Sequence, residues 1–137
     1  MIEAGDPLPR VVFLCFGNAC RSQMAEAYAR ALGAGVLEAA SAGLHPVGFI
    51  PPEVGIVMEE EGISVEGLRS KSLEEAKAAK ADLIVDLVGG TLPDFRGIAV
   101  RSRPVVDPFG KGLGDYRRTR DTVRCEVEAL IGELRRG

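Results

Sequence analysis

The sequence predicts a single three-layer α/β/α domain around a parallel sheet of about four strands. Residues 11–14 and 81–88 are short, continuous apolar runs, as expected of strands that are buried on both faces. Residues 36–40 and 98–103 are weaker strand candidates. Helical patterns separate these runs, and strands that alternate with helices imply crossover connections and a parallel sheet covered on both faces.

The spacing of apolar residues predicts four helices, over about residues 24–32, 51–61, 72–80 and 113–134. Gly33 and Gly62 stand where the first and second of these helices would end. Ser72, with Glu75 three residues later, resembles a capping box that would begin the third. The fourth carries one apolar stripe that would pack against the rest of the domain.

Length and composition restrict the classes of function. The 137 residues suit one domain, so we expect a single domain over residues 1–137. The formal charge of −3, with both signs interspersed, does not suggest a nucleic-acid partner. No apolar run could span a bilayer, and residues 1–10 lack a basic segment followed by an apolar stretch. We therefore expect no membrane partner and no signal peptide.

The three cysteines, Cys15, Cys20 and Cys125, are not spaced as a zinc site or as the disulfide framework of a secreted domain. Free thiols are typical of a reducing compartment, which favours a cytoplasmic location. We expect neither a metal site nor a cofactor.

The most informative stretch joins the first predicted strand to the first helix. It is the loop Cys15, Phe16, Gly17, Asn18, Ala19, Cys20, Arg21 and Ser22. Ligands of open parallel sheets bind beyond the carboxyl ends of the strands, where N–H groups at a helix N-terminus favour an anion. Gly17 allows a close approach of the backbone, and Asn18 is one of the few non-glycine residues that tolerate a positive φ. The whole loop is therefore a candidate phosphate-binding site.

Cys15 and Arg21 would supply the chemistry of this site. The planar guanidinium of Arg21 can hold two oxygens of a phosphate. The same guanidinium and the loop N–H groups favour the thiolate form of Cys15, which can attack a bound oxyanion in line. Ser22 could stabilise that thiolate through its hydroxyl. A cysteine in an apolar strand is usually a small buried hydrophobe, but the position of Cys15 between a buried strand and a helix favours the nucleophile.

The sequence resembles the low-molecular-weight protein tyrosine phosphatase superfamily, which includes thiol-linked arsenate reductases. Residues 11–26 match its signature almost position by position. Further matches are the Ser-Ala-Gly of residues 41–43, residues 58–63 and the Asp-Pro of residues 107–108. The resemblance covers essentially the whole chain and implies a four-stranded parallel sheet flanked by helices.

The resemblance also implies roles for individual residues. Cys15 would be the nucleophile, Arg21 the phosphate clamp and Asp107 the general acid. Asn18 and Ser41 would support the loop. The chemistry requires a general acid in any case, because a departing alkoxide or phenoxide needs a proton. Without the resemblance, an Asp-Pro pair is more often simply a turn.

Two departures from the superfamily pattern concern the substrate pocket. Tyrosine phosphatases of this type usually carry two tyrosines after the Asp-Pro pair, whereas Phe109 and Gly110 stand here. A second aromatic wall is expected after residues 41–43, where the chain offers His45 and Phe49. We therefore expect Phe109 to line the pocket, and the pattern does not establish specificity for phosphotyrosine.

Other positions resemble the reductase branch. Gln23, Gly110 and residues 113–120 are more similar to arsenate reductases than to tyrosine phosphatases. Those reductases relay electrons through further cysteines after the third strand, but residues 87–91 contain no thiol. Arsenate fits the same cradle as phosphate, yet its adduct with Cys15 must be resolved by a second sulfur, from Cys20 or from an external thiol.

The two other cysteines have weaker claims. By the same resemblance, Cys20 could trap an oxidised Cys15 as a disulfide, or it could simply fill the interior of the loop. Cys125 falls opposite the apolar stripe of the last helix and is expected to be an incidental, partly exposed thiol.

The sequence favours a hydrolase that cleaves phosphomonoesters through a cysteinyl-phosphate, similar to a protein tyrosine phosphatase. Its substrate partner would be a phosphorylated protein or a small aryl phosphate. An alternative is arsenate reduction with an external thiol carrier. A second alternative is a non-catalytic module that binds an oxyanion and regulates a partner.

Overall fold

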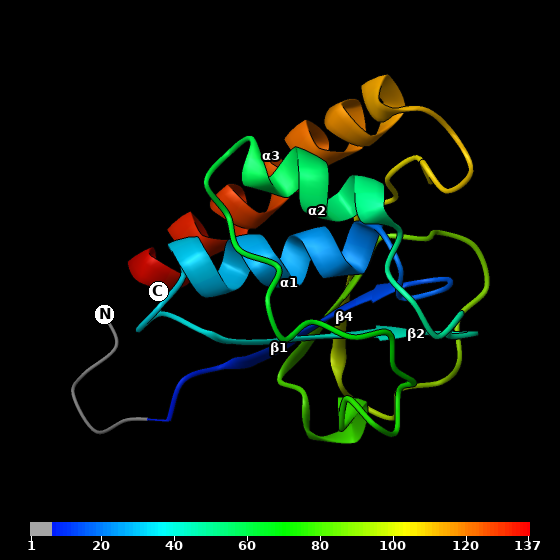
Figure 1. The fold of residues 1–137 in the computed structure, drawn as a ribbon. Helices are drawn as coiled ribbons and strands as arrows, with labels where there is room; N and C mark the ends of the chain where they lie inside the picture. Colours follow the sequence, from blue (N-terminus) through cyan, green and yellow to red (C-terminus); the bar gives the residue numbers. More distant parts are fainter. Residues whose placement is uncertain (1–6) are drawn as a thin grey trace.

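The computed structural model describes residues 7–137 and confirms an α/β fold around four parallel strands (Figure 1). The strands are β1 (Arg10–Cys15), β2 (Glu38–Gly43), β3 (Leu83–Asp86) and β4 (Ala99–Ser102). Their order in the sheet is β2-β1-β3-β4, and every neighbouring pair is parallel. The strand register pairs Cys15 with Gly43 and Leu14 with Asp86.

Three helices, α1 (Arg21–Leu32), α2 (Pro52–Glu59) and α3 (Leu113–Arg136), lie on one side of the sheet (Figure 1). Val11 and Phe13 of β1 point to that side and join the same core as Met24 and Tyr28 of α1. All four side chains are almost completely buried. Burial of this apolar surface is the main term that holds the helices on the sheet.

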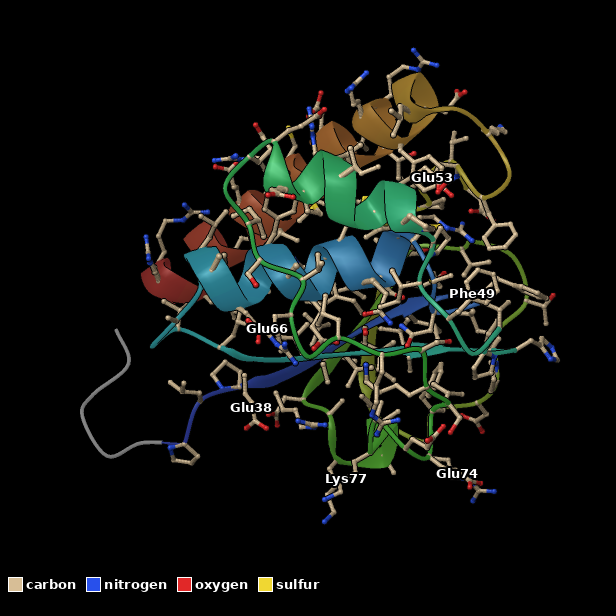
Figure 2. The ribbon with its side chains drawn as sticks, in the orientation of Figure 1. Glu38, Phe49, Glu53, Glu66, Glu74 and Lys77 are labelled. Carbon is tan, nitrogen blue, oxygen red and sulfur yellow. The ribbon has the colours of Figure 1, made fainter. Side chains whose placement is uncertain are left out.

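Irregular chain covers the opposite face of the sheet. Val12, Leu14 and Ile84 point to that face and pack against small residues of the segment before β3. The helical part of this cover, among residues 7–137, is the short 3-10 turn η1 (Ala78–Lys80). Glu74 and Lys77 extend from the cover, away from the three helices (Figure 2). The third layer is therefore thin.

The expectation of an α-helix over residues 72–80 is wrong, although its capping box is formed. The Ser72 N–H donates to the Glu75 carboxylate over 3.0 Å, and the Glu75 N–H donates to the Ser72 hydroxyl over 3.1 Å. Lys77 then adopts the left-handed conformation, with φ 55°, and ends the turn. The break lets Ala76 and Ala78 both enter the core below the sheet, whereas residues two apart in a straight helix do not share a face.

The other expected strands and helices are confirmed, with shifted ends. α1 begins earlier than the periodicity indicates, at Arg21, and β3 ends at Asp86. β3 stops there because the Asp86 carboxylate accepts hydrogen bonds from the N–H groups of Val88 and Gly89.

Among residues 7–137, no helix has both the length and the apolar character needed to cross a bilayer. The expectation about a signal peptide falls mainly on residues 1–6, which lie outside the described residues.

The topology places the end of β1 at a crevice. The chain leaves β1 for β2 on one side and later crosses to β3 on the other side, so the connections diverge beyond Cys15. Such a switch point, at the carboxyl ends of parallel strands, is where open α/β sheets bind ligands.

The last residue of β2 presses directly against the loop at this crevice. A Cβ added to Gly43 would lie 2.7 Å from the backbone nitrogen of Asn18 and 2.9 Å from its Cβ. By contrast, a Cβ added to Gly17 would meet the flexible side chain of Val47, at 3.0 Å. The close approach of β2 to the loop therefore requires a glycine at Gly43. The requirement at Gly17, the glycine expected from the sequence, is weaker.

We predict that Gly43→Ala destabilises the fold by about 1–3 kcal/mol, because the overlap is with backbone that cannot move freely. The matched control is Gly55→Ala in α2, where the nearest contact of a new Cβ is an ordinary 3.7 Å to Val65. Gly55→Ala should be neutral or stabilising by up to about 1 kcal/mol. Urea unfolding of the three proteins measures both effects, and equal stability of Gly43→Ala and wild type would show that the loop does not press on β2.

Candidate active site

The loop after β1 encloses the sulfur of Cys15. Cys15 is only 2% exposed, and its Sγ lies 2.8 Å from the Ser22 Oγ. That oxygen accepts a hydrogen bond from the Asn18 Nδ2 over 2.7 Å, which leaves the Ser22 proton free to point at the sulfur. The Ser22 hydroxyl is therefore placed to donate a hydrogen bond to the Cys15 sulfur.

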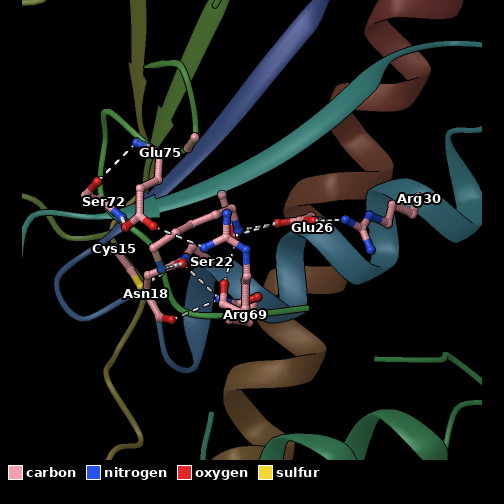
Figure 3. A network of polar contacts seen from close by, with 12 residues as sticks. Cys15, Asn18, Ser22, Glu26, Arg30, Arg69, Ser72 and Glu75 are labelled. Carbon is pink, nitrogen blue, oxygen red and sulfur yellow. Dashed lines mark hydrogen bonds and ion pairs between the residues drawn. The ribbon is translucent and has the colours of Figure 1, made fainter. Parts of the chain in front are cut away.

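Asn18 sets the course of the loop. It adopts the left-handed conformation, with φ 48°, and is completely buried. Its Oδ1 accepts hydrogen bonds from the backbone N–H of Lys71, over 2.8 Å, and from the Gln23 Nε2, over 2.9 Å. With the bond from its amide to Ser22, every polar group of this side chain has a partner (Figure 3).

The bend at Asn18 directs carbonyls outward and leaves amides free. The carbonyls of Phe16 and Gly17 accept the N–H groups of His45 and Val47, over 2.8 and 3.0 Å. The N–H groups of residues 17–20 donate to no described residue. Free amides in the pocket that Cys15 lines are donors of the kind that a tetrahedral oxyanion requires.

A buried ionic cluster lies behind Asn18 (Figure 3). The carboxylate of Glu26, 1% exposed, accepts hydrogen bonds from the Ser41 hydroxyl over 2.6 Å and from the Lys71 ammonium over 3.2 Å. Arg30 forms an ion pair with the other carboxylate oxygen. Ser41, expected to support the loop, therefore reaches it through Lys71 rather than directly.

Sequence reasoning missed Glu26 and Lys71. The only local signal was the position of Glu26, a charged residue within the apolar spacing of α1. The Lys71 ammonium also donates to the Ser41 hydroxyl over 3.1 Å and to the Arg69 carbonyl over 3.2 Å, so all three of its protons have partners. A buried charge pair is tolerated when its remaining hydrogen bonds are satisfied, as they are here.

Arg21 is buried beside Cys15 and only partly satisfied by protein. Its Nη1 donates to the carbonyls of Leu87 and Val105, over 3.3 and 3.1 Å, and its Nη2 lies 3.5 Å from the Asp107 Oδ2. Its Nε is buried and has no hydrogen-bond partner among the described residues. A buried donor without a partner destabilises the fold by about 1–3 kcal/mol. An oxygen of a bound anion that accepted a hydrogen bond from the Nε would remove this cost.

Asp107 lies across the pocket from the loop. Its Oδ1 accepts the backbone N–H of Phe109 over 3.0 Å, while its Oδ2 faces Arg21. The carboxylate is half-exposed, so a substrate can reach it. The preceding residue is held by the Thr119 hydroxyl, which donates to the Val106 carbonyl over 3.1 Å.

The structure brings the predicted nucleophile, clamp and acid into one pocket of about 220 Å³. Its lining residues are Cys15, Phe16, Gly17, Ala19, Cys20, Arg21, Val47, Asp107 and Phe109. Asn18 and Ser22 are not part of this lining and are joined to each other by a hydrogen bond, whereas Ser41 is bonded to Glu26 and Lys71. The pocket floor can therefore hold an oxyanion between a sulfur, a guanidinium and a carboxyl group.

Aromatic side chains form the rim of this pocket. Phe16 and His45 form a tilted contact with ring centroids 5.0 Å apart, and Phe49 and Phe109 form another with centroids 6.0 Å apart. The three phenylalanine side chains are about half exposed. Both rings that the sequence offered for a second wall, His45 and Phe49, thus pack against residues that line the pocket.

Cys20 shares the pocket but is chemically restrained. Its thiol donates to the Tyr116 hydroxyl over 3.7 Å. Burial raises the pKa of Cys20 to about 12, although the hydrogen bond with Tyr116 offsets part of this rise. Cys20 is therefore a protonated thiol at neutral pH.

Cys125 is exposed on α3 and does not line the pocket. Within residues 7–137, no three His, Cys, Asp or Glu side chains cluster as metal ligands.

The chain is similar to known proteins over almost its whole length. Residues 10–137 match the model of the family described as low molecular weight phosphotyrosine protein phosphatase. A glutaredoxin arsenate reductase of Synechocystis sp. is 34% identical in an alignment of 131 residues, and the match covers 93% of this chain and 99% of that protein.

Solved structures agree with this match. An arsenate reductase in its phosphate-binding state superposes with a TM-score of 0.84 at 34% identity, covering 93% of this chain and 99% of that one. A low molecular weight protein tyrosine phosphatase from T. tengcongensis superposes with a TM-score of 0.76 at 29% identity, covering 91% and 99%.

We predict that Cys20 resists alkylation at pH 7, because a thiol with a raised pKa contains almost no thiolate. In the Cys15→Ser protein, iodoacetamide should label the exposed Cys125 and leave Cys20 unmodified, as measured by peptide mass spectrometry. Labelling of Cys20 should become appreciable only well above neutral pH. Labelling at the rate of Cys125 would mean that burial does not hold the proton on this sulfur.

Proposed function

The chain belongs to the low molecular weight phosphotyrosine protein phosphatase family, and from this premise we propose that it is an arsenate reductase that uses an external thiol. The single observation that carries this choice is the 34% identity to the glutaredoxin arsenate reductase over almost the full length of both chains. It supports the reductase alternative better than the phosphatase interpretation. The pocket geometry suits the first step of either reaction.

In the first step the Cys15 thiolate attacks arsenic. The attack forms an S–As bond and expels one oxygen of arsenate, which leaves as water after protonation by Asp107. The free amides of residues 17–20 and the Arg21 guanidinium hold the remaining oxygens. Preorganised donors of this kind stabilise charge that develops in the transition state.

In the second step an external thiolate attacks the Cys15 sulfur. The S–As bond breaks, its electron pair remains on arsenic, and arsenic(V) becomes arsenic(III) as arsenite is released. Cys15 is left in a mixed disulfide, which a second external thiol reduces. The balance is arsenate plus two thiols giving arsenite, one disulfide and water.

The thiol must come from outside because the chain offers no suited second sulfur. Residues 87–91 contain no cysteine, and Cys125 lies away from the pocket. Burial keeps Cys20 protonated, which makes it a poor attacking group. A thiol carrier such as glutaredoxin, named in the Synechocystis relative, would supply the electrons. This dependence suits a reducing compartment such as the cytoplasm.

We predict arsenate-dependent oxidation of NADPH when the protein is coupled to glutathione, glutaredoxin and glutathione reductase. Cys15→Ser should lower this rate by more than about 10³-fold, because no covalent adduct can form. Cys125→Ser is the matched control and should retain the wild-type rate. Arsenite production that survives Cys15→Ser would contradict the mechanism. A protein that binds vanadate but turns over neither arsenate nor aryl phosphates would instead be a regulatory module that binds an oxyanion.

A phosphomonoester hydrolase is the second candidate, favoured by the position of Asp107. Its Oδ2 faces the Arg21 guanidinium across the pocket, where it can protonate a leaving oxygen. The ring of Phe109 provides a wall for an aryl group. In this reaction Cys15 forms a cysteinyl-phosphate, the alcohol departs with the proton of Asp107, and water then hydrolyses the S–P bond.

If the second candidate holds, Asp107→Asn should lower kcat for phenyl phosphate by about 10²–10⁴-fold. The loss should be smaller for p-nitrophenyl phosphate, whose leaving group needs a proton less. Steady-state rates with the two substrates measure the difference. An equal loss for both substrates would exclude Asp107 as the acid and leave it as a structural turn.

A further inference from the structure

A second hollow lies on the face of the sheet that, among residues 7–137, is covered by the single turn η1 and by no α-helix. It measures about 600 Å³, within the range of small-molecule sites, and shares no lining residue with the Cys15 pocket. Its lining residues are Leu73, Glu74, Lys77, Ala78, Ala79, Lys80, Pro93, Asp94, Phe95, Arg96 and Ile98. One wall is therefore the segment around η1, and the other is the loop between β3 and β4.

The floor of this hollow is apolar. Leu73, Phe95 and Ile98 are only half-buried and pack on the core cluster below the sheet. The hollow follows from the thin third layer, because a single turn stands where a helix would have covered these side chains. Partly buried apolar side chains that line a hollow are a feature of ligand sites.

The rim of the hollow carries cations without partners. Lys77, Lys80 and Arg96 are exposed and form no ion pair with any residue of 7–137. Two carboxylates, Glu74 and Asp94, also lie on the rim. Asp94 is turned toward its own loop, where it accepts the Arg96 N–H over 2.9 Å. The cations outnumber the carboxylates, so the rim favours an anion.

Each wall of the hollow contains one basic residue whose backbone has a positive φ. Lys77 and Arg96 have φ of 55° and 49°, and the remaining non-glycine residue with positive φ in the described chain is Asn18 of the active-site loop. Such conformations concentrate at ligand-binding and catalytic positions. The strain at Lys77 and Arg96 places one cation on each side of the hollow.

We propose that this hollow binds a small amphiphilic anion, a carboxylate with an aliphatic or aromatic tail. The tail lies on the floor of Leu73, Phe95 and Ile98. The carboxylate reaches the basic side chains at the rim. This site is separate from the oxyanion pocket and adds a ligand class that the proposed function does not include.

The test is calorimetric titration of the protein with decanoate in saturating phosphate, which occupies the pocket at Cys15. We expect binding of one decanoate per chain, with decanol binding more weakly. Lys77→Asn/Arg96→Asn removes both charges while keeping a residue that tolerates positive φ. It should weaken decanoate at least about tenfold, equivalent to about 1.4 kcal/mol. Arg135→Gln/Arg136→Gln, at the exposed end of α3, removes equal charge and should leave the affinity unchanged.

A second variant protects the test against misfolding of the first. Ala79→Phe fills the hollow from an exposed position and should also weaken decanoate. No binding, binding that both variants leave unchanged, or binding that occurs only when phosphate is omitted would overturn the proposal. Self-association that Ala79→Phe abolishes would also overturn it, in favour of a second copy of the chain. Because phosphate fills the other pocket throughout, these failures leave the proposed function untouched.

Discussion

The left-handed bend at Asn18 is the constraint on which the site depends. It turns two carbonyls toward residues 45 and 47 and leaves the following amides free around the Cys15 sulfur. A non-glycine residue keeps this conformation only when its surroundings determine it strongly. Here Ser22, Gln23 and the backbone of Lys71 satisfy the whole Asn18 side chain. The same side chain thus fixes both the amide cradle and the hydroxyl that stabilises the sulfur.

Arg21 connects this loop to the rest of the sheet. One guanidinium touches the carbonyls that follow β3 and β4 and also faces Asp107. These contacts fix the distance between the nucleophile and the carboxyl group opposite. They leave the Nε buried and without a hydrogen-bond partner among residues 7–137, a state that is unfavourable without an anion. An anion bound in the pocket could accept a hydrogen bond from this donor, which fits the proposal of a tetrahedral ligand.

The sequence was sufficient to predict the strands and the loop after β1, because both depend on local pattern or on a short motif. Asp107 was placed beside Cys15 and Arg21 only through the family resemblance, and the structure brings the three side chains into one pocket. The sequence failed at residues 72–80, where the capping box is real but the packing of Ala76 and Ala78 under the sheet overrides the helix. It also missed the pair of Glu26 and Lys71, which lie 45 residues apart and meet only in the folded chain. Phosphatase and reductase chemistry remained close alternatives because both use the same cradle.

The most direct test of the account is a crystal structure with orthovanadate. The account predicts a vanadium atom bonded to the Cys15 sulfur, with one oxygen within about 2.7–2.9 Å of the Arg21 Nε. Loop amides of residues 17–20 should donate to the other oxygens. An anion bound elsewhere, with the Arg21 Nε satisfied by protein and the sulfur covered, would contradict it.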